Sequence, residues 1–343
     1  SQALGRMINI LGEDPLLGKT YEKLVKIPIE EANISIMDRG TVNEQLHTGI
    51  TGIDLMYPIG LGQRQLIIGD KKTGKTQIAL DTIVNQKGKG IVCIYCPIGK
   101  TMKEVKKIYY DLLNKEAMNY TIIIPAFNDY PAPSLVLTPY YAMSIARRYM
   151  TVGTNCLVVF DDLKRHADAY REVSLMSGKA PGRDAYPADI FYLHSRLLEK
   201  GCKYKNGASI TVLPIVETRG EDITDYISTN IISITDGQLV LSSKNFQKGI
   251  KPAINYGLSV SRLGGAVQNK EMKATGTLVR RRLLSYLEMA SIYELSNQDE
   301  LSDGIKAVMS EGKKILNGLT QNRYSPKSEE EMLETYAFLR ESK

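Results

Sequence analysis

One octapeptide constrains the fold of this chain more than any other feature. Residues 69–76 read Gly-Asp-Lys-Lys-Thr-Gly-Lys-Thr, which satisfies G-x-x-x-x-G-K-[ST]. A short apolar run at residues 65–69 leads into it, and helical spacing follows at residues 76–86. In that order, backbone N–H groups can close around phosphate oxygens at a helix N-terminus, where the helix dipole favours negative charge. The motif therefore predicts a phosphate-binding loop in an α/β domain.

The residues of this loop have distinct predicted roles. Lys75 is expected to reach the β- and γ-phosphates, and the Thr76 hydroxyl to join the shell of a Mg²⁺ ion. An apolar run at residues 157–160 ends in Asp161 and Asp162, and open α/β sheets place their sites at the carboxyl ends of strands. We expect Asp161 to hold the Mg²⁺ through water. The expected nucleotide contacts in the loop are Gly69, Asp70, Lys71, Lys72, Thr73, Gly74, Lys75 and Thr76.

The remaining apolar runs predict a parallel sheet covered on both faces. These runs do not alternate with polar residues, and amphipathic segments separate several of them, which is typical of strands buried between helices. The expected strands are residues 90–96, 120–124, 156–160, 210–216 and 231–234. The expected intervening helices are residues 101–113 and 142–150.

Beyond about residue 268 the pattern changes to consecutive amphipathic helices without a strand after them. They are expected at residues 271–294, 300–320 and 328–343. We therefore expect residues 1–267 to form an α/β nucleotide-binding domain and residues 268–343 to form part of an all-helical domain. The total length of 343 residues agrees with a prior of about two domains.

Composition excludes several classes of protein. No run approaches the ~18 consecutive apolar residues of a membrane span, and no signal-peptide core is visible, so we expect a cytoplasmic chain. A net charge of +6 permits contact with nucleic acid but does not demand it, and no nucleic-acid partner is expected. Cys93 and Cys96 form C-x-x-C inside an apolar run. Positions three apart on a strand point to opposite faces, so we expect buried core residues there and not a metal or redox pair.

Longer segments carry a resemblance to the α-type subunits of F-type rotary ATP synthases. The similar segments are residues 60–70, 73–76, 81–87, 181–187, 191–199, 233–238 and 252–262. The resemblance implies a RecA-like α/β fold that binds ATP or ADP with Mg²⁺. It also implies β-type catalytic subunits alternating with this chain in a ring, and a central γ-type stalk. The membrane would be contacted only indirectly, on its cytoplasmic face.

The resemblance also implies roles for single residues. β-type subunits carry a water-activating glutamate after the strand that follows the P-loop helix, and α-type subunits carry a glutamine there; this chain has Lys100. A protonated lysine cannot accept a proton from water, so nucleotide is expected to bind without hydrolysis. The alternative is that Lys100 points to solvent and another acid activates the water.

Arg262 matches the arginine that reaches into the neighbour's catalytic site. The implied adenine pocket comprises Phe246, Lys251, Pro252, Gln321 and Arg323.

Departures from the family leave alternatives open. The start of the chain resembles the start of the nucleotide-binding domain, so the family's N-terminal β-barrel has no counterpart, and the helices stop early. Either the chain is trimmed or it is a divergent paralogue, and Lys72, Lys100 and Ser228 favour divergence. Such a paralogue would serve a specialised motor for motility or surface machinery of a wall-less bacterium. The runner-up is a homohexameric RecA-like translocase, such as a Rho-like RNA helicase or a secretion ATPase, which needs a catalytic carboxylate in every subunit.

Overall fold

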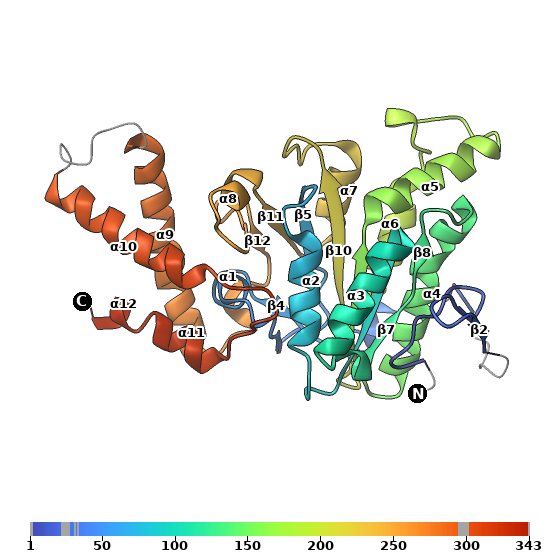
Figure 1. The fold of residues 1–343 in the computed structure, drawn as a ribbon, viewed down its shortest axis with the longest axis horizontal. Coiled ribbons are helices and arrows are strands. Elements are labelled where there is room, and N and C mark those ends of the chain that lie inside the picture. Colours follow the sequence, from blue (N-terminus) through green and yellow to red (C-terminus); the bar gives the residue numbers. More distant parts are fainter. Residues whose placement is uncertain (1–2, 22–27, 31, 33, 294–301, 342–343) are drawn as a thin grey trace.

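A mostly parallel sheet forms the centre of the molecule (Figure 1). The computed structural model describes residues 3–21, 28–30, 32, 34–293 and 302–341. Within them the strand order is β12-β11-β5-β10-β9-β6-β7, with β8 also paired to β6, and only β12 runs antiparallel to its neighbour. The strands are β5 (Leu66–Asp70), β6 (Ile91–Lys100), β7 (Thr121–Ile123), β8 (Ala126–Phe127), β9 (Asn155–Asp161), β10 (Ile210–Thr218), β11 (Gly237–Leu241) and β12 (Val260–Ser261).

Helices cover both faces of this sheet. The helices that precede β12 are α1 (Thr51–Met56), α2 (Lys75–Val84), α3 (Met102–Asn114), α4 (Ala132–Thr151), α5 (Leu163–Met176), α6 (Ile190–Leu198), α7 (Tyr226–Ile234) and α8 (Ser243–Gln247). Short strand pairs, β1 (Glu13–Asp14) with β2 (Lys19–Thr20) and β3 (Gln45–Leu46) with β4 (Ile59–Gly60), lie outside the main sheet. No helix among the described residues is long and apolar enough to cross a membrane.

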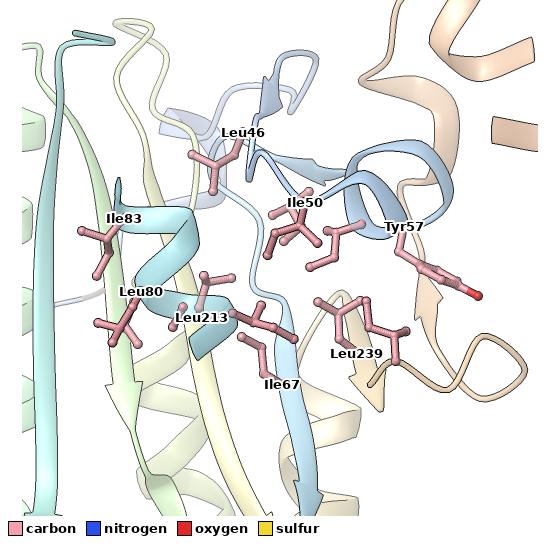
Figure 2. Close-up of a cluster of buried hydrophobic side chains, with 14 of the residues drawn as sticks. Leu46, Ile50, Tyr57, Ile67, Leu80, Ile83, Leu213 and Leu239 are labelled. Atoms are coloured by element: carbon pink, nitrogen blue, oxygen red, sulfur yellow. The ribbon is translucent and has the colours of Figure 1, made fainter. Parts of the chain in front are cut away.

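The core is split into two layers by the sheet. One layer lies under α1, α2 and α3, where side chains from three parallel strands meet those of α2 (Figure 2). The other layer lies under α4 to α7. Cys93 belongs to the first layer and Cys96 to the second, and both thiols are buried and free. The predicted opposite orientation of the C-x-x-C pair is therefore confirmed. Figure 2 labels Leu46, Ile50, Tyr57, Ile67, Leu80, Ile83, Leu213 and Leu239 in the first layer.

The predicted α/β fold is confirmed, with one strand wrong. Residues 231–234, expected as a strand, form the end of helix α7, and the next strand, β11, was missed. The Asp225 side chain accepts hydrogen bonds from the amides of Ile227 and Ser228 and so caps the helix. Ile227, Ile231 and Ile234 are buried at helical spacing, which a search for short apolar runs reads as a strand.

The chain after the sheet is helical, as predicted. It comprises α9 (Lys270–Tyr293), α10 (Asp303–Leu319), α11 (Glu329–Thr335) and α12 (Phe338–Glu341), at the left of Figure 1. The predicted helix at residues 328–343 is interrupted near Tyr336, and residues 294, 300, 301, 342 and 343 of the predicted helices lie outside the described residues. We propose the division at residues 267 and 268, which falls between β12 and α9.

Glycines allow the helical part to approach its neighbours closely. A Cβ placed on Gly276 of α9 would lie 2.0 Å from the backbone oxygen of Leu55 in α1. A Cβ on Gly312 of α10 would lie 2.1 Å from Cγ of Tyr286 in α9. Neither contact leaves room for a side chain, so these two positions fix how α9 sits on α1 and how α10 sits on α9.

Candidate functional site

The loop of residues 69–76 joins β5 to α2 at the carboxyl end of the sheet. Gly74 has φ of 101°, in the left-handed region, and immediately precedes α2. Gly69 packs against β11, where a Cβ would lie 2.8 Å from the backbone oxygen of Leu241. Lys71 and Lys72 are exposed, and Lys72 has φ of 66°. The backbone thus turns sharply into a helix N-terminus that faces the loop, as phosphate binding requires.

Lys75 folds back onto this loop. Its ammonium donates a hydrogen bond to the backbone oxygen of Asp70, and only 7% of the residue is exposed. The hydroxyl of Thr73 donates to the same oxygen at 2.7 Å. Burial lowers the pKa of Lys75, and the nearby carboxylates of Glu217 and Asp162 oppose the shift. The lysine is therefore held inside the loop by a group that a phosphate oxygen can replace.

The side chain of Asp70 has a structural role. Its Oδ1 accepts hydrogen bonds from the Thr218 hydroxyl at 2.7 Å and from the Glu221 amide at 2.9 Å. These bonds tie the end of β5 to the end of β10 and to the loop that follows. Within the predicted set, Asp70 contributes its backbone, while its carboxylate holds neighbouring segments in place.

Asp161 is the centre of a cluster at the ends of β9 and β6. Its Oδ2 accepts hydrogen bonds from the Thr76 hydroxyl at 2.6 Å and from the Tyr95 hydroxyl at 2.8 Å. Its Oδ1 lies 3.1 Å from the ammonium of Lys100, and the Asp161 side chain is 3% exposed. The two residues predicted to hold Mg²⁺, Thr76 and Asp161, are therefore in direct contact.

Asp162, the next residue, faces a different task. Its carboxylate accepts a hydrogen bond from the Arg165 amide at 2.8 Å and caps helix α5. Burial, with the neighbouring Asp161 charge, raises the pKa of Asp162 to about 6. A cap at the N-terminus of α5 fixes this carboxylate close to Asp161 without making it a competing partner of Thr76.

Lys100 does not point to solvent, contrary to the alternative considered from the sequence. It ends β6, which runs beside β9, so its side chain emerges next to Asp161, and it is 21% exposed. Burial alone would lower the pKa of Lys100, but the attraction of Asp161 reverses the effect and the pKa is raised. A cation therefore lies beside the Asp161 carboxylate.

Four of the five residues predicted for an adenine pocket are connected. The Lys251 ammonium lies 5.1 Å from the centre of the Phe246 ring, and the Lys251 backbone oxygen accepts a hydrogen bond from the Gln321 amide at 2.7 Å. Pro252 follows Lys251 in the chain. The fifth residue, Arg323, is exposed. Its charge opposes the rise in the pKa of Asp81 in α2 that burial causes.

The side chain of Gln321 is already committed. Its Oε1 accepts from the amide and the hydroxyl of Thr51, both at 3.2 Å. Its Nε2 donates to the backbone oxygens of Gly49 at 2.7 Å and Ser325 at 2.6 Å. Three of these four hydrogen bonds therefore join the helical part to the chain around the start of α1, and the fourth, to Ser325, stays within the helical part.

Arg262 lies at the opposite edge of the sheet from the phosphate loop. Ser261 of β12 pairs with Gly237, the first residue of β11, and the Arg262 amide donates to the Asp236 backbone oxygen at 2.9 Å. The side chain is exposed, and one guanidinium nitrogen lies 3.5 Å from the backbone oxygen of Ile232. At about 3.3 Å per residue, the four-residue rise from the amino end of β11 to its carboxyl end separates Arg262 from the loop by at least about 13 Å.

Two groups near the loop were not predicted from the sequence as members of the site. The Tyr95 hydroxyl donates to Asp161, and the charge of Glu217 in β10 opposes the fall in the pKa of Lys75 that burial causes. Asp162 was named with Asp161 but was given no role. Tyr95 could not be placed from the sequence, because its position depends on the pairing of β6 with β9: its register partner Val159 lies on the same face as Asp161, two residues on. For Glu217 the signal was its place near the carboxyl end of a strand beside β5.

Known proteins resemble this chain along most of its length. The profile of the ATP synthase alpha/beta family, nucleotide-binding domain, matches residues 49–261. The protein described as ATP synthase subunit alpha of Macrococcus caseolyticus (strain JCSC5402) is 45% identical over 329 residues. The match covers 95% of this chain and 65% of that relative, so the chain spans about two thirds of the relative's length.

Proposed function

Because this chain belongs to the ATP synthase alpha/beta family, we propose that it is an alpha-type subunit that binds ATP or ADP with Mg²⁺ at residues 69–76 and does not hydrolyse it. The backbone turn at Gly74 and the buried ammonium of Lys75 support phosphate binding at the start of α2. The exposed Lys71 and Lys72 add positive charge on the approach to the loop.

One observation carries the non-catalytic role: the ammonium of Lys100 lies 3.1 Å from Asp161 at the end of the strand next to β9. Hydrolysis needs a group that accepts a proton from the attacking water, and a lysine that is already charged cannot do so. A homohexameric translocase would need that group in every subunit, so the same lysine argues against this alternative. We therefore infer that nucleotide bound here stays bound.

The oxygen ligands at the end of the loop fit Mg²⁺. Thr76 and Asp161 present a hydroxyl and a carboxylate 2.6 Å apart, and Mg²⁺ at nucleotide sites takes one or two such groups together with phosphate oxygens and water. Among the described residues no group of three or more His, Cys, Asp or Glu side chains could hold a metal ion. A metal here would thus depend on the nucleotide's own oxygens, with Thr76 as ligand and Asp161 acting through water.

At the base end, we propose that Phe246, Lys251 and Pro252 form the side of the adenine pocket. Phe246 is 37% exposed and supplies the aromatic ring on which a base would stack, and the Lys251 ammonium lies over that ring. Gln321 would act through its backbone link to Lys251, since its amide group is used elsewhere. Arg323, beside Asp81, would approach the nucleotide from the helical part.

We further propose that Arg262 acts in trans on a neighbouring β-type subunit. It is exposed and lies at the edge of the sheet remote from its own phosphate loop, so its guanidinium is available to another chain and not to its own nucleotide. An arginine supplied in this way stabilises the charge of the transferring phosphoryl group. The implied assembly alternates this chain with β-type subunits around a γ-type stalk, on the cytoplasmic face of a membrane.

Steady-state ATP turnover with and without a β-type partner tests this function. The chain alone is expected to bind ATP with negligible turnover, and the mixture is expected to hydrolyse ATP. Arg262→Ala should lower turnover of the mixture by roughly 10³-fold or more, as arginine fingers do elsewhere. Arg148→Ala, which removes an exposed arginine from α4, is the matched control and should leave turnover unchanged.

Two outcomes would contradict the proposal. Rapid turnover by the chain alone would remove the non-catalytic role. Full turnover by the Arg262→Ala mixture, with assembly confirmed by gel filtration, would remove the role in trans.

A further inference from the structure

The two carboxylate oxygens of Asp161 have different partners. Oδ2 receives hydrogen bonds from the neutral hydroxyls of Thr76 and Tyr95, whereas Oδ1 faces the ammonium of Lys100 at 3.1 Å. In a P-loop site, the carboxylate in this place serves a divalent cation. Here one of the two carboxylate oxygens, Oδ1, already lies beside a positively charged side chain, Lys100.

This second cation lies close to the first. The charge of Lys100 contributes to lowering the pKa of Lys75, and both side chains are largely buried. Lys75 is the lysine of the phosphate loop, so the Lys100 ammonium lies within electrostatic range of the same phosphates. The carboxylates of Asp161 and Asp162 favour the charged form of both lysines, so two buried positive charges are compatible here.

An ammonium is suited to this place. It is a compact charge with three N–H donors, and one of them suffices for Asp161 Oδ1, which leaves two for phosphate oxygens. Lysine binds phosphate elsewhere as a point charge. The Tyr95 hydroxyl donates to the other carboxylate oxygen, Oδ2, and so also holds Asp161 in position. The carboxylate can therefore remain ordered with Lys100 still beside it.

We propose that Lys100 is a resident cation at the metal end of the nucleotide site, so that this chain retains ATP or ADP with little dependence on Mg²⁺. The inference rests on the proposed binding of nucleotide at residues 69–76 and adds to it what neutralises the phosphates. The ammonium takes over part of the charge neutralisation that Mg²⁺ supplies at other P-loop sites.

The test is the dissociation constant of ATP, measured by titration calorimetry with excess Mg²⁺ and again with EDTA. The quantity compared is the dissociation constant in EDTA divided by the dissociation constant with Mg²⁺. In the wild-type chain this ratio should stay below about tenfold, which corresponds to about 1.4 kcal/mol. In Lys100→Gln it should rise by about tenfold more, because the neutral amide leaves the phosphate charge to the metal.

Two further variants separate charge at this point from other effects. Lys100→Arg keeps the positive charge and should keep the low ratio of the wild type. Lys103→Gln removes the same net charge from an exposed position on α3 and should also keep it. Thermal unfolding of each variant shows that it is folded, and Lys100→Arg still tests the proposal if Lys100→Gln is unstable.

The outcomes distinguish this inference from the proposed function. If the wild-type chain binds no ATP even with Mg²⁺, the proposed function fails and the inference fails with it. If ATP binds tightly with Mg²⁺ but EDTA weakens binding of the wild type as much as that of Lys100→Gln, the proposed function stands and the inference is overturned.

Discussion

Two buried histidines predict that this fold is sensitive to acid. His166 of α5 and His194 of α6 are fully buried, with Nδ1 of His166 3.2 Å from Nε2 of His194. Nε2 of His166 lies 3.1 Å from the backbone oxygen of Val136, which can only accept, so this nitrogen carries a proton. Nδ1 of His166 then accepts from the N–H of His194. This assignment, made from the hydrogen bonds, keeps both rings neutral.

The size of the effect follows from the pKa values. Burial lowers the pKa of His166 to about 4 and that of His194 well below its ordinary value. In the unfolded chain both titrate near 6.5. Between these values the unfolded state binds more protons than the folded state, so stability is retained above about pH 6.5 and is lost as the pH falls toward 4. At pH 5 each ring should lower the free energy of unfolding by about 2 kcal/mol, and the pair should lower it by about 4 kcal/mol.

Urea unfolding at pH 7 and pH 5 measures this loss. Carboxylates also contribute to acid destabilisation, so the informative quantity is a difference between variants. His194→Gln keeps an N–H donor for His166 but cannot titrate. Between pH 7 and pH 5 its free energy of unfolding should therefore fall by about 2 kcal/mol less than that of the wild type. His47→Gln changes the third histidine, which is partly exposed beside Glu329, and is the control. Equal losses in the wild type and His194→Gln would refute the assignment of two neutral buried rings.

Two pairs of glycine substitutions make further predictions. Gly276→Ala places a methyl group against the Leu55 backbone oxygen and should lower the free energy of unfolding by about 1–3 kcal/mol, whereas Gly304→Ala on α10 meets open space and should not lower it. Chemical denaturation compares the two. Gly74→Ala and Gly88→Ala each put a side chain at positive φ in open space, at 101° and 76°, and each should cost about 1–2 kcal/mol. Only Gly74→Ala should also weaken ATP binding in the titration with Mg²⁺, because only Gly74 forms the phosphate loop.

Most of the sheet could be predicted because its strands are continuous apolar runs. β6 nevertheless continues four residues past the predicted end, through Pro97 and Gly99, and these residues carry Lys100 to the site. Short runs without flanking context were ambiguous: residues 231–234 are helical because Asp225, six residues earlier, caps the helix. Helix α4 begins at Ala132, ten residues before the predicted start, and keeps Pro139 inside it. Local pattern predicted the type of each long element and was least reliable at its ends.

The site was predictable where a motif specifies its backbone and unpredictable where partners come from different strands. Gly74, Lys75 and Thr76 are fixed by the turn into α2, and Asp161 by the end of a strand. The contact between Lys100 and Asp161 depends on β6 lying directly beside β9, which the order of strands along the chain does not specify.

Gln321 was predicted to face the base, but its side chain joins the helical part to Gly49 and Thr51. A single polar residue cannot indicate from sequence which of two neighbours it will bind.

The two edges of the sheet explain why this chain would complete another subunit's site and not its own. Parallel strands place the phosphate loop at their carboxyl ends, and β12, which runs antiparallel to β11 in the main sheet, returns the chain to their amino ends before Arg262. No rotation of a side chain spans a distance of at least about 13 Å between the two edges. If nucleotide binds at residues 69–76 as proposed, the positive charge of this chain that lies near the phosphates comes from the carboxyl ends of the strands, where Lys75 and Lys100 lie. In the proposed ring, built head to tail, the amino ends of the strands in each such chain would face a neighbour, so the proposed role of Arg262 is one that it would have only in the assembly.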